Sequence, residues 1–324
     1  MNYVPLGNTG LNVSQLCFGT MTFGGGGCDF DTAQAIFRRC RDIGINFFDC
    51  ANGYVKGESE KILGRLMKPE RDRLIITTKL GMGSGIDASG PGYSRAHIMY
   101  HVEQSLRRLD TDYIDIYFLH RFHEQPPLDD VMRAMDDLVR QGKVRYPGAS
   151  NFAAWQVAKA NGIAKANGVS PFRCIQPMYS LLKRQAEVEL LPMAQSEGIG
   201  VINYSPLAGG ILTGKYGKKN LQVDGRLKES EPYRKRYANE DNYEVAQSLG
   251  DIAQQLGCHV VSLAIAWVAA HPGITAPIIG ARNLDQLEPS LKSLDIDMTA
   301  ELYEQVSSLT PTPAIATDRE EERT

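Results

Sequence analysis

Short apolar runs alternate with longer amphipathic stretches along most of the chain, and eight such rounds can be counted. Each run has the length of a strand, and most are continuously apolar. Continuous hydrophobicity is typical of parallel strands that are covered on both faces. The predicted strands are residues 15–19, 45–49, 74–79, 113–120, 144–150, 173–177, 200–204 and 276–280.

The intervening stretches have helical periodicity, as residues 94–110, "SRAHIMYHVEQSLRRLD", illustrate. Ser94 can act as the N-cap of this helix, because a serine hydroxyl accepts a hydrogen bond from a free backbone N–H at a helix start. The apolar positions that fall on one face are Ile98, Val102, Leu106 and Leu109. Such a face is expected to pack against the sheet.

The order of these elements predicts an α/β fold, a (β/α)8 TIM barrel. No Pro/Gly/Ser-rich linker divides the chain, which favours a closed barrel over an open, doubly wound sheet. Residues 3–14 alternate around an Asn-Thr-Gly turn and predict an N-terminal hairpin that closes the bottom of the barrel. After strand 7, residues 214–237 form a long polar loop that predicts a lid. We expect residues 1–311 to be a single barrel domain and residues 312–324 to be a disordered acidic tail.

Composition and charge narrow the function classes. The net charge is −3 with both signs interleaved, so no nucleic-acid partner is expected. The longest apolar stretch, residues 260–270, is shorter than the ~20 residues of a membrane span, and the first residues lack a signal-peptide pattern. The six cysteines include no CxxC pair, which disfavours disulfides and zinc. These features predict a cytoplasmic protein with reduced thiols and no membrane association.

Polar side chains stand at or just beyond the ends of seven predicted strands. In a barrel of this type the active site forms at the C-terminal ends of the strands. We therefore expect these side chains to meet at one site. In chain order they are Asp49, Lys79, His120, the pair Ser150 and Asn151, Gln176, Tyr204 and Arg282.

Asp49, Tyr54, Lys79 and His120, in this order, resemble the catalytic tetrad of the aldo-keto reductases. The resemblance extends over nearly the whole chain and includes the motifs "FDCANGYVKGESEKILG", "ITTKLG", "IDIYFLHRFH", "LVRQGKVRYPGASNF", "IQPMYS" and "GVINYSPLAGGILTGKY". The last motif is similar to the branch that contains bacterial general reductases and the β-subunits of voltage-gated potassium channels. The resemblance implies an NADPH-dependent reduction of aldehydes or ketones to alcohols, which is reversible.

The residue types explain how such a reaction would work. Tyr54 is the candidate proton donor, but a free phenol has a pKa of ~10 and is a weak acid near neutral pH. Lowering that pKa by two or three units requires about 3–4 kcal/mol, which one cation ~4 Å away at an effective dielectric of ~20 supplies. We therefore expect Lys79 to lower the pKa of Tyr54. Asp49 would keep Lys79 charged, and His120 would orient the substrate oxygen.

The usual dinucleotide fingerprint G-x-G-x-x-G is absent from the sequence, so a Rossmann site is not predicted. Residues 209–215, "GGILTGK", have the spacing of a P-loop, but the next residue is Tyr216 instead of Ser or Thr. The segment is therefore not predicted to bind ATP or GTP. In the family that the chain resembles, this segment wraps the pyrophosphate of the dinucleotide, and glycine amides with Lys215 would serve that purpose here.

The resemblance also implies the positions of the NADPH/NADP+ contacts. Ser150, Asn151 and Gln176 would hold the nicotinamide carboxamide, and Tyr204 would stack on the ring. Arg282 would bind the adenosine 2′-phosphate, for which a guanidinium is well suited. The remaining cofactor-binding candidates are Ser205, Leu207, Gly209, Lys215, Gly280 and Gln286.

Two departures and two alternatives accompany this interpretation. Pro289 and Ser290 stand where related sequences carry Glu-Asn, which affects the adenine contacts, and Pro147 interrupts the fifth strand. His120 and His123 form an HxxH, but no further ligand pattern follows and no metal is predicted. A regulatory NADP(H)-binding subunit that docks on a partner protein stays open beside the enzyme with a small-molecule carbonyl substrate. The sequence indicates neither an oligomeric state nor a particular substrate.

Overall fold

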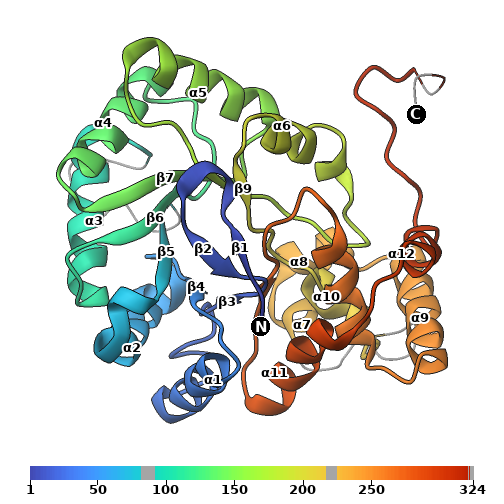
Figure 1. Cartoon of the computed structure of the whole chain (residues 1–324). Helices are drawn as coiled ribbons and strands as arrows, with labels where there is room; N and C mark the ends of the chain where they lie inside the picture. Colours follow the sequence, from blue (N-terminus) through green and yellow to red (C-terminus); the bar gives the residue numbers. More distant parts are fainter. Residues whose placement is uncertain (82–91, 217–224, 320, 322–324) are drawn as a thin grey trace.

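The computed structural model describes residues 1–81, 92–216, 225–319 and 321. Its main sheet has eight parallel strands in the order β10-β3-β4-β5-β6-β7-β8-β9 (Figure 1). Backbone hydrogen bonds close the barrel, from Ala276 N to Val201 O at 3.2 Å and from Ile278 N to Asn203 O at 2.9 Å. The strands are β3 Cys17–Gly19, β4 Phe47–Asp49, β5 Ile75–Leu80, β6 Ile114–Leu119, β7 Val144–Ser150, β8 Cys174–Gln176, β9 Gly200–Val201 and β10 Ile278–Ile279. The predicted (β/α)8 barrel is confirmed.

Helices surround the sheet and cover its outer face (Figure 1). They are α1 Phe30–Asp42, α2 Glu58–Met67, α3 Arg95–Leu109, α4 Leu128–Arg140, α5 Ala154–Asn167, α6 Leu190–Ser196, α7 Arg226–Glu229, α8 Glu231–Tyr237, α9 Glu240–Gln255, α10 Val260–Ala270, α11 Leu284–Leu291 and α12 Ala300–Ser307. The predicted N-cap of α3 is confirmed, because the Ser94 hydroxyl accepts from His97 N at 3.2 Å. Within the described ranges no single helix is long and apolar enough to cross a membrane, although α9 and α10, bent by 99°, pass that test as a pair.

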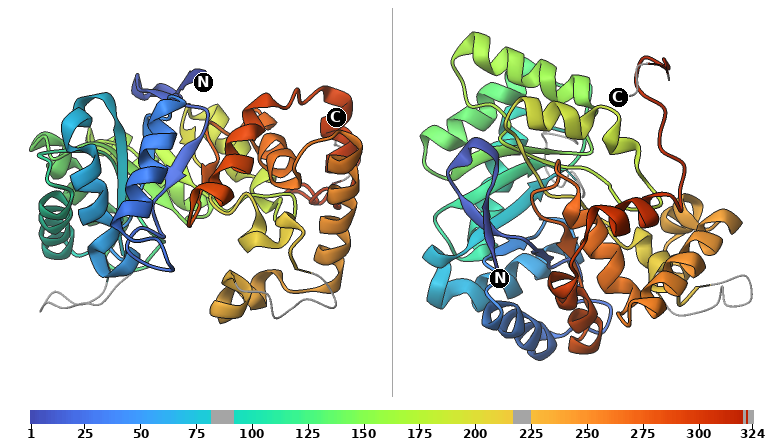
Figure 2. Two further views of the ribbon diagram at one scale, coloured as in Figure 1. Left: turned by 90° about the horizontal axis from the view of Figure 1, so that it is seen from below. Right: turned by 45° about the vertical axis from the view of Figure 1, so that its right-hand side comes forward.

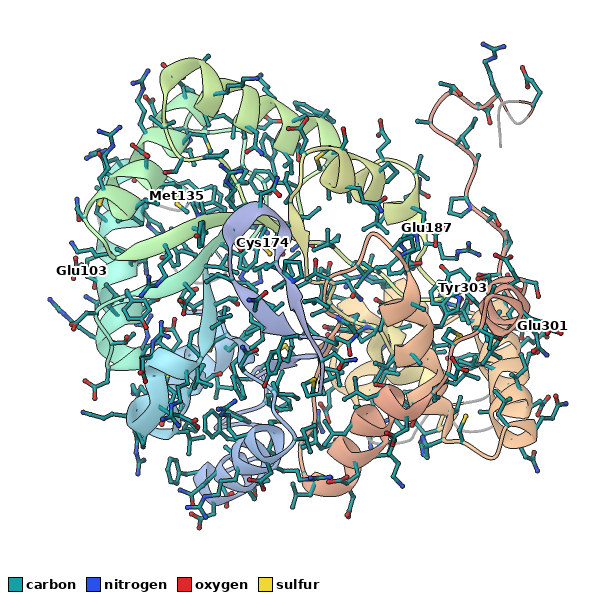
Figure 3. All side chains as sticks on the ribbon, in the orientation of Figure 1. Glu103, Met135, Cys174, Glu187, Glu301 and Tyr303 are labelled. Atoms are coloured by element: carbon teal, nitrogen blue, oxygen red, sulfur yellow. The ribbon has the colours of Figure 1, made fainter. Side chains whose placement is uncertain are left out.

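The predicted N-terminal hairpin is also confirmed. Strands β1 Tyr3–Pro5 and β2 Asn12–Ser14 pair antiparallel, and the hairpin lies across one end of the barrel (Figure 1). Its side chains Leu6 and Val13 are fully buried and pack with the apolar residues that fill the barrel interior. Cys174 of β8 is one of these and lies behind the hairpin in Figure 3. The hairpin therefore closes one end of the barrel and leaves the other end for a site.

The long connection after β9 lies at the opposite end of the barrel from the hairpin (Figure 2). Its described part contains the 3-10 helix η5 Ala208–Thr213 and the short helices α7 and α8. After α12 the chain runs away from the barrel (Figure 1). The division into a barrel of residues 1–311 and a disordered tail stays a prediction.

The proline in β7 has a physical explanation in the register of the sheet. Pro147 O accepts from Arg173 N at 2.9 Å, so the polar backbone groups of Pro147 face the β8 side of the strand. The ladder between β7 and β8 begins one residue later, at Gly148 and Cys174. An N–H at position 147 would therefore point at residues that precede β8 and do not pair with β7. The proline thus costs the sheet no hydrogen bond at this position.

Candidate functional site

The alternation of side chains along β5 directs Lys79 into the barrel. Ile75 belongs to the interior cluster that the hairpin covers, whereas Ile76 packs among the surrounding helices. Because successive side chains point to opposite faces, Thr77 and Lys79 share the interior face with Ile75. The strand thus places an apolar residue near the hairpin and a cation near the opposite end.

Three other polar residues occupy the same kind of position. Each follows an interior apolar residue by two positions, which keeps it on the interior face. The pairs are Phe47 with Asp49, Phe118 with His120, and Cys174 with Gln176. All three polar residues are buried. The end of the barrel away from the hairpin therefore carries a buried polar layer above the apolar interior.

Lys79 is the centre of this layer. Its Nζ donates to Asp49 Oδ2 at 2.6 Å, to the backbone oxygen of Cys50 at 2.6 Å and to the Tyr54 hydroxyl at 3.2 Å. The side chains of Lys79 and Asp49 are 0% and 3% exposed. Burial opposes the charge on Lys79, yet Asp49 and Tyr54 outweigh it and raise the pKa of the amine. Lys79 is consequently a cation at neutral pH and donates all three of its hydrogens.

The second oxygen of Asp49 has two further donors. Oδ1 accepts from Thr77 Oγ1 at 2.5 Å and from Gln176 Nε2 at 2.9 Å. The sequence interpretation did not include Thr77, although its place two residues before Lys79 on the same face is a signal that could have identified it. Gln176 was assigned to the cofactor alone, and the structure shows that it also holds Asp49. The carboxylate is therefore stabilised by three side chains.

Tyr54 begins the 3-10 segment η2 Tyr54–Gly57, whose backbone is unusual. Val55 and Lys56 have φ values of 46° and 55°, in the left-handed region that a β-branched residue such as valine rarely adopts. Val55 packs against the backbone of Gly25, where an added Cβ would be 3.1 Å from a Val55 methyl. This strained turn carries the chain sharply away after Tyr54 and leaves the phenol beside Lys79.

Lys79 lowers the pKa of Tyr54 as expected, but the expected net pKa below that of a free phenol is wrong for this structure. Burial of the phenol raises the pKa of Tyr54 to about 12, and the lowering effect of Lys79 only partly offsets it. Asp49 adds to the increase, because its negative charge disfavours a phenolate. One nearby lysine does not offset the free-energy cost of removing a phenolate from water. Tyr54 is therefore fully protonated at neutral pH.

His120 lies on the other side of Tyr54, with ring centroids 6.2 Å apart and an interplanar angle of 79°. Burial lowers the pKa of His120 to about 3, and the charges of Lys79 and Arg121 add to this effect. The imidazole is therefore neutral at physiological pH. Its Nδ1 is buried and finds no hydrogen-bond partner among the described residues. The ring thus has hydrogen-bonding capacity that the described part of the chain does not use.

The residues expected at the nicotinamide form a network that contacts two of the four candidate catalytic residues, His120 and, through Gln176, Asp49. Asn151 Nδ2 donates to His120 O at 2.9 Å and to Ser150 Oγ at 3.0 Å, and Tyr204 donates to Asn151 Oδ1 at 2.7 Å. Ser150 Oγ donates in turn to Gln176 O at 3.0 Å. The structure therefore brings these four residues together. Both hydrogens of the Asn151 amide are already engaged within the protein, so a bound carboxamide could use only the remaining acceptor position or displace a partner.

Four further candidates, Ser205, Leu207, Gly209 and Lys215, follow β9 in one segment. Ser205 and Gly209 have positive φ values of 58° and 67°. A Cβ on Gly209 would be 2.8 Å from the Tyr233 ring, so the segment turns tightly against the polar connection that follows it. Gly209 is buried, and the rings of Tyr233 and Tyr237 pack where a side chain would stand.

The last candidates, Gly280, Arg282 and Gln286, follow β10. Gln286 Oε1 accepts from Arg282 N at 3.1 Å. The Arg282 guanidinium binds the Glu229 carboxylate of α7 through two hydrogen bonds, of 3.1 and 2.6 Å. Sequence reasoning missed Glu229, and no local pattern could have identified a partner 53 positions away.

Pro289 and Ser290, which replace the Glu-Asn of related sequences, take part in helix packing in this structure. Both lie in α11, and Ser290 is buried. The Ser262 hydroxyl of α10 donates to Pro289 O at 2.6 Å. Proline cannot donate a helical hydrogen bond. Pro289 therefore joins α11 to α10, and the Ser290 side chain is buried rather than presented to solvent.

Comparisons with known proteins find matches along nearly the whole chain. The sequence model of the aldo/keto reductase family matches residues 15–311. The chain is 37% identical to the uncharacterized oxidoreductase YrpG of Bacillus subtilis, over 97% of each chain. It is 35% identical to a probable voltage-gated potassium channel subunit beta of Oryza sativa, over 95% of this chain and 96% of that protein. A protein of the same description in Arabidopsis thaliana is 36% identical, over 91% of this chain and 92% of its own length.

Proposed function

The chain belongs to the aldo/keto reductase family, and from this premise we propose that it is an NADPH-dependent oxidoreductase that reversibly reduces aldehydes or ketones to alcohols. The observation that carries this proposal is the position of Lys79, whose Nζ donates to both Asp49 and Tyr54 inside the barrel. A buried cation beside a phenol is suited to stabilising the anion that remains after the phenol gives up a proton. Carbonyl reduction needs such a group, because a protein side chain must donate a proton to the oxygen of the substrate.

Tyr54 would act as the general acid. Members of this family generally use nicotinamide cofactors, and the cofactor would supply a hydride to the carbonyl carbon. Negative charge then develops on the carbonyl oxygen, and the Tyr54 hydroxyl donates its proton there. With its pKa raised to about 12, Tyr54 holds this proton at neutral pH. Lys79, 3.2 Å from the hydroxyl oxygen, stabilises the phenolate as it forms.

His120 would orient the substrate. Because burial and two nearby cations keep the pKa of its ring at about 3, His120 is neutral and binds an oxygen by a hydrogen bond rather than by charge. The ring keeps hydrogen-bonding capacity that the described residues do not use, which supports this role. The two rings are T-shaped with centroids 6.2 Å apart, and this proximity supports a role for both side chains at one carbonyl oxygen.

The residues present fit the proposed cofactor. The amides of Asn151 and Gln176 and the hydroxyl of Ser150 lie together, and a carboxamide would bind their remaining hydrogen-bonding positions or displace a partner. Tyr204 adds an aromatic ring beside them. Glycine at position 209 would let the backbone approach a pyrophosphate closely once the Tyr233 ring that packs against it moved aside. Arg282 has the planar, bidentate donor geometry that suits the 2′-phosphate of NADPH. We propose these residues, with Ser205, Leu207, Lys215, Gly280 and Gln286, as the cofactor site.

The test is to follow NADPH oxidation by the purified protein against a panel of aldehydes and ketones. Turnover of at least one carbonyl, lost in the Tyr54→Phe variant, is the expected result. A protein that binds NADPH but turns over no member of a broad panel would contradict the enzymatic proposal.

The six cysteines are all free thiols, which is compatible with action in a reducing compartment such as the cytoplasm.

A second candidate function is a regulatory, NADP(H)-binding subunit that docks on a partner protein. It is favoured by the two relatives described as probable channel subunits. A pull-down that recovers one stable partner in stoichiometric amount, together with cofactor binding but no carbonyl turnover, would support this candidate over the enzyme.

A further inference from the structure

Arg282 and Glu229 form a bidentate ion pair between the end of β10 and the connection that follows β9. The two N···O distances are 3.1 and 2.6 Å, and the side chains are 30% and 49% exposed. Glu229 is the last residue of α7, within the polar connection on the far side of the barrel from the hairpin (Figure 2). The pair therefore joins this connection to the barrel at the residue proposed to read the 2′-phosphate.

The guanidinium of Arg282 is held from a second side. An added Cβ on Gly26 would be 3.4 Å from Arg282 Nε, so the side chain packs over glycine backbone in the loop after β3. The Arg282 backbone is fixed by its hydrogen bond to Gln286. Gly26 on one side and Glu229 on another therefore keep the guanidinium in one place.

A carboxylate and a phosphate compete for the same donors on such a guanidinium. Both accept two parallel N–H···O bonds from the fork of an arginine. Glu229 already accepts from Nη1 and Nη2 of Arg282. A 2′-phosphate that binds Arg282 in this way must displace the carboxylate, and it would also meet its negative charge.

We propose that Glu229 is a cofactor-selectivity residue, whose carboxylate competes with the 2′-phosphate of NADPH for Arg282. This inference rests on the proposed function, since it assumes that Arg282 reads the 2′-phosphate. Glu229 lowers the affinity for NADPH and leaves the affinity for NADH unchanged, because NADH has a hydroxyl at this position. The chain thus discriminates between the two cofactors less strongly than Arg282 alone would allow.

The expected change in NADPH affinity depends on the fraction of molecules in which Arg282 is not paired with Glu229. When only a fraction of the molecules is competent to bind, the apparent dissociation constant increases by the inverse of that fraction. A partly exposed ion pair is weak, so we expect Glu229→Gln to tighten NADPH about two- to fivefold. Fivefold corresponds to about 1 kcal/mol at ~1.4 kcal/mol per tenfold. The effect should shrink at high salt, which screens exposed pairs.

The experiment titrates NADPH and NADH separately against the full chain by fluorescence. The variants are Glu229→Gln, Arg282→Ala and the double substitution. Glu231→Gln is the matched control, because it removes the same charge two residues away, where the Glu231 carboxylate pairs with Lys235 at 2.8 Å. We expect Glu229→Gln alone to tighten NADPH selectively, Glu231→Gln to change neither cofactor, and Glu229→Gln to have no effect in the Arg282→Ala background.

Each other outcome overturns the proposal in a recognisable way. If Arg282→Ala weakens NADPH selectively but Glu229→Gln does not tighten it, the cofactor assignment stands and the competition is wrong. A gain that persists without Arg282, or that Glu231→Gln reproduces, would show general charge repulsion instead of competition for the guanidinium. If Arg282→Ala affects both cofactors equally or neither, or if the wild-type chain binds neither, the assignment of Arg282 fails and Glu229 loses its role with it.

Discussion

Gln176 donates its side-chain amide hydrogen to Asp49 Oδ1 at 2.9 Å, although the two residues are 127 positions apart in the sequence. The bond joins the end of β8 to the end of β4 across the barrel interior. Asp49 also pairs with Lys79, so Gln176 lies two hydrogen bonds from the amine beside Tyr54. The same amide is proposed to contact the cofactor, and this arrangement would let one residue link the cofactor position to the charge state of the catalytic layer.

The first prediction concerns Gln176→Leu, which removes this donor and keeps an apolar side chain of similar size. A hydrogen bond to a charged group contributes about 1.5–3 kcal/mol, so we expect urea unfolding to show a loss of this size. Thr77→Val is the matched variant, because it removes the other donor to the same oxygen, at 2.5 Å. Two variants with wild-type stability would show that the Asp49 carboxylate does not depend on its neutral donors.

The second prediction is that Tyr54→Phe abolishes carbonyl reduction and leaves cofactor affinity nearly unchanged. The substitution removes only the hydroxyl, which Lys79 contacts at 3.2 Å, and keeps the ring. General acid catalysis contributes about a hundredfold or more, and loss of the acid should reduce turnover accordingly. Turnover with NADPH and a fluorescence titration of the cofactor measure the two effects. A variant that retains wild-type turnover would mean that another group protonates the product.

The third prediction concerns Lys79→Met, which should change both pH dependence and stability. Lys79 lowers the pKa of Tyr54 against the effect of burial, so its removal raises that pKa further. If the activity falls at high pH because Tyr54 loses its proton, that fall should occur at higher pH in the variant. The rate of the variant should also be lower. Asp49 would remain as a buried charge without its cation, which costs about 3–5 kcal/mol. Denaturant unfolding and the pH–rate profile test this, and an unchanged profile at full activity would contradict it.

The positions of Asp49, Lys79 and His120 could be predicted from the sequence because strands impose a period of two. Lys79 follows Ile75 by four residues, and Asp49 follows Phe47 by two, so both fall on the face that the interior apolar residues define. The barrel closes these faces around one axis and brings their ends together. The alternation of side chains along each strand therefore determined where the polar groups meet.

The electrostatic state of the site could not be predicted in the same way. Burial of Tyr54 decides the direction of its pKa shift, and the sequence does not show how much water the surrounding residues exclude. The pairing of Arg282 with Glu229 depends on how a long irregular connection folds back on the barrel. No periodicity constrains such a segment, because its conformation is set by tertiary contacts.

The last prediction is that His120 makes the folded protein less stable below pH 6.5. An unfolded histidine takes up a proton near pH 6.5, whereas burial and the nearby charges hold the pKa of folded His120 at about 3. Between these values the unfolded state binds the extra proton, so acid favours unfolding. The stability contribution is complete above pH 6.5 and is lost as the pH falls towards 3. For this one group the loss at pH 5 is about 2 kcal/mol relative to neutral pH.

The measurement is the free energy of unfolding in urea between pH 7.5 and pH 5, for wild type and for His120→Gln. Other groups titrate in this range, and the comparison with the variant removes their common contribution. We expect the pH dependence to flatten by about 2 kcal/mol in His120→Gln. His123→Gln is the matched control, because the pKa of His123 is also lowered, by burial first and then by Arg121, but its side chain is less buried. Its substitution should flatten the curve less. Parallel curves for wild type and His120→Gln would show that His120 takes up its proton over the same pH range in the folded and unfolded states, and the lowered pKa of the folded residue would then be wrong.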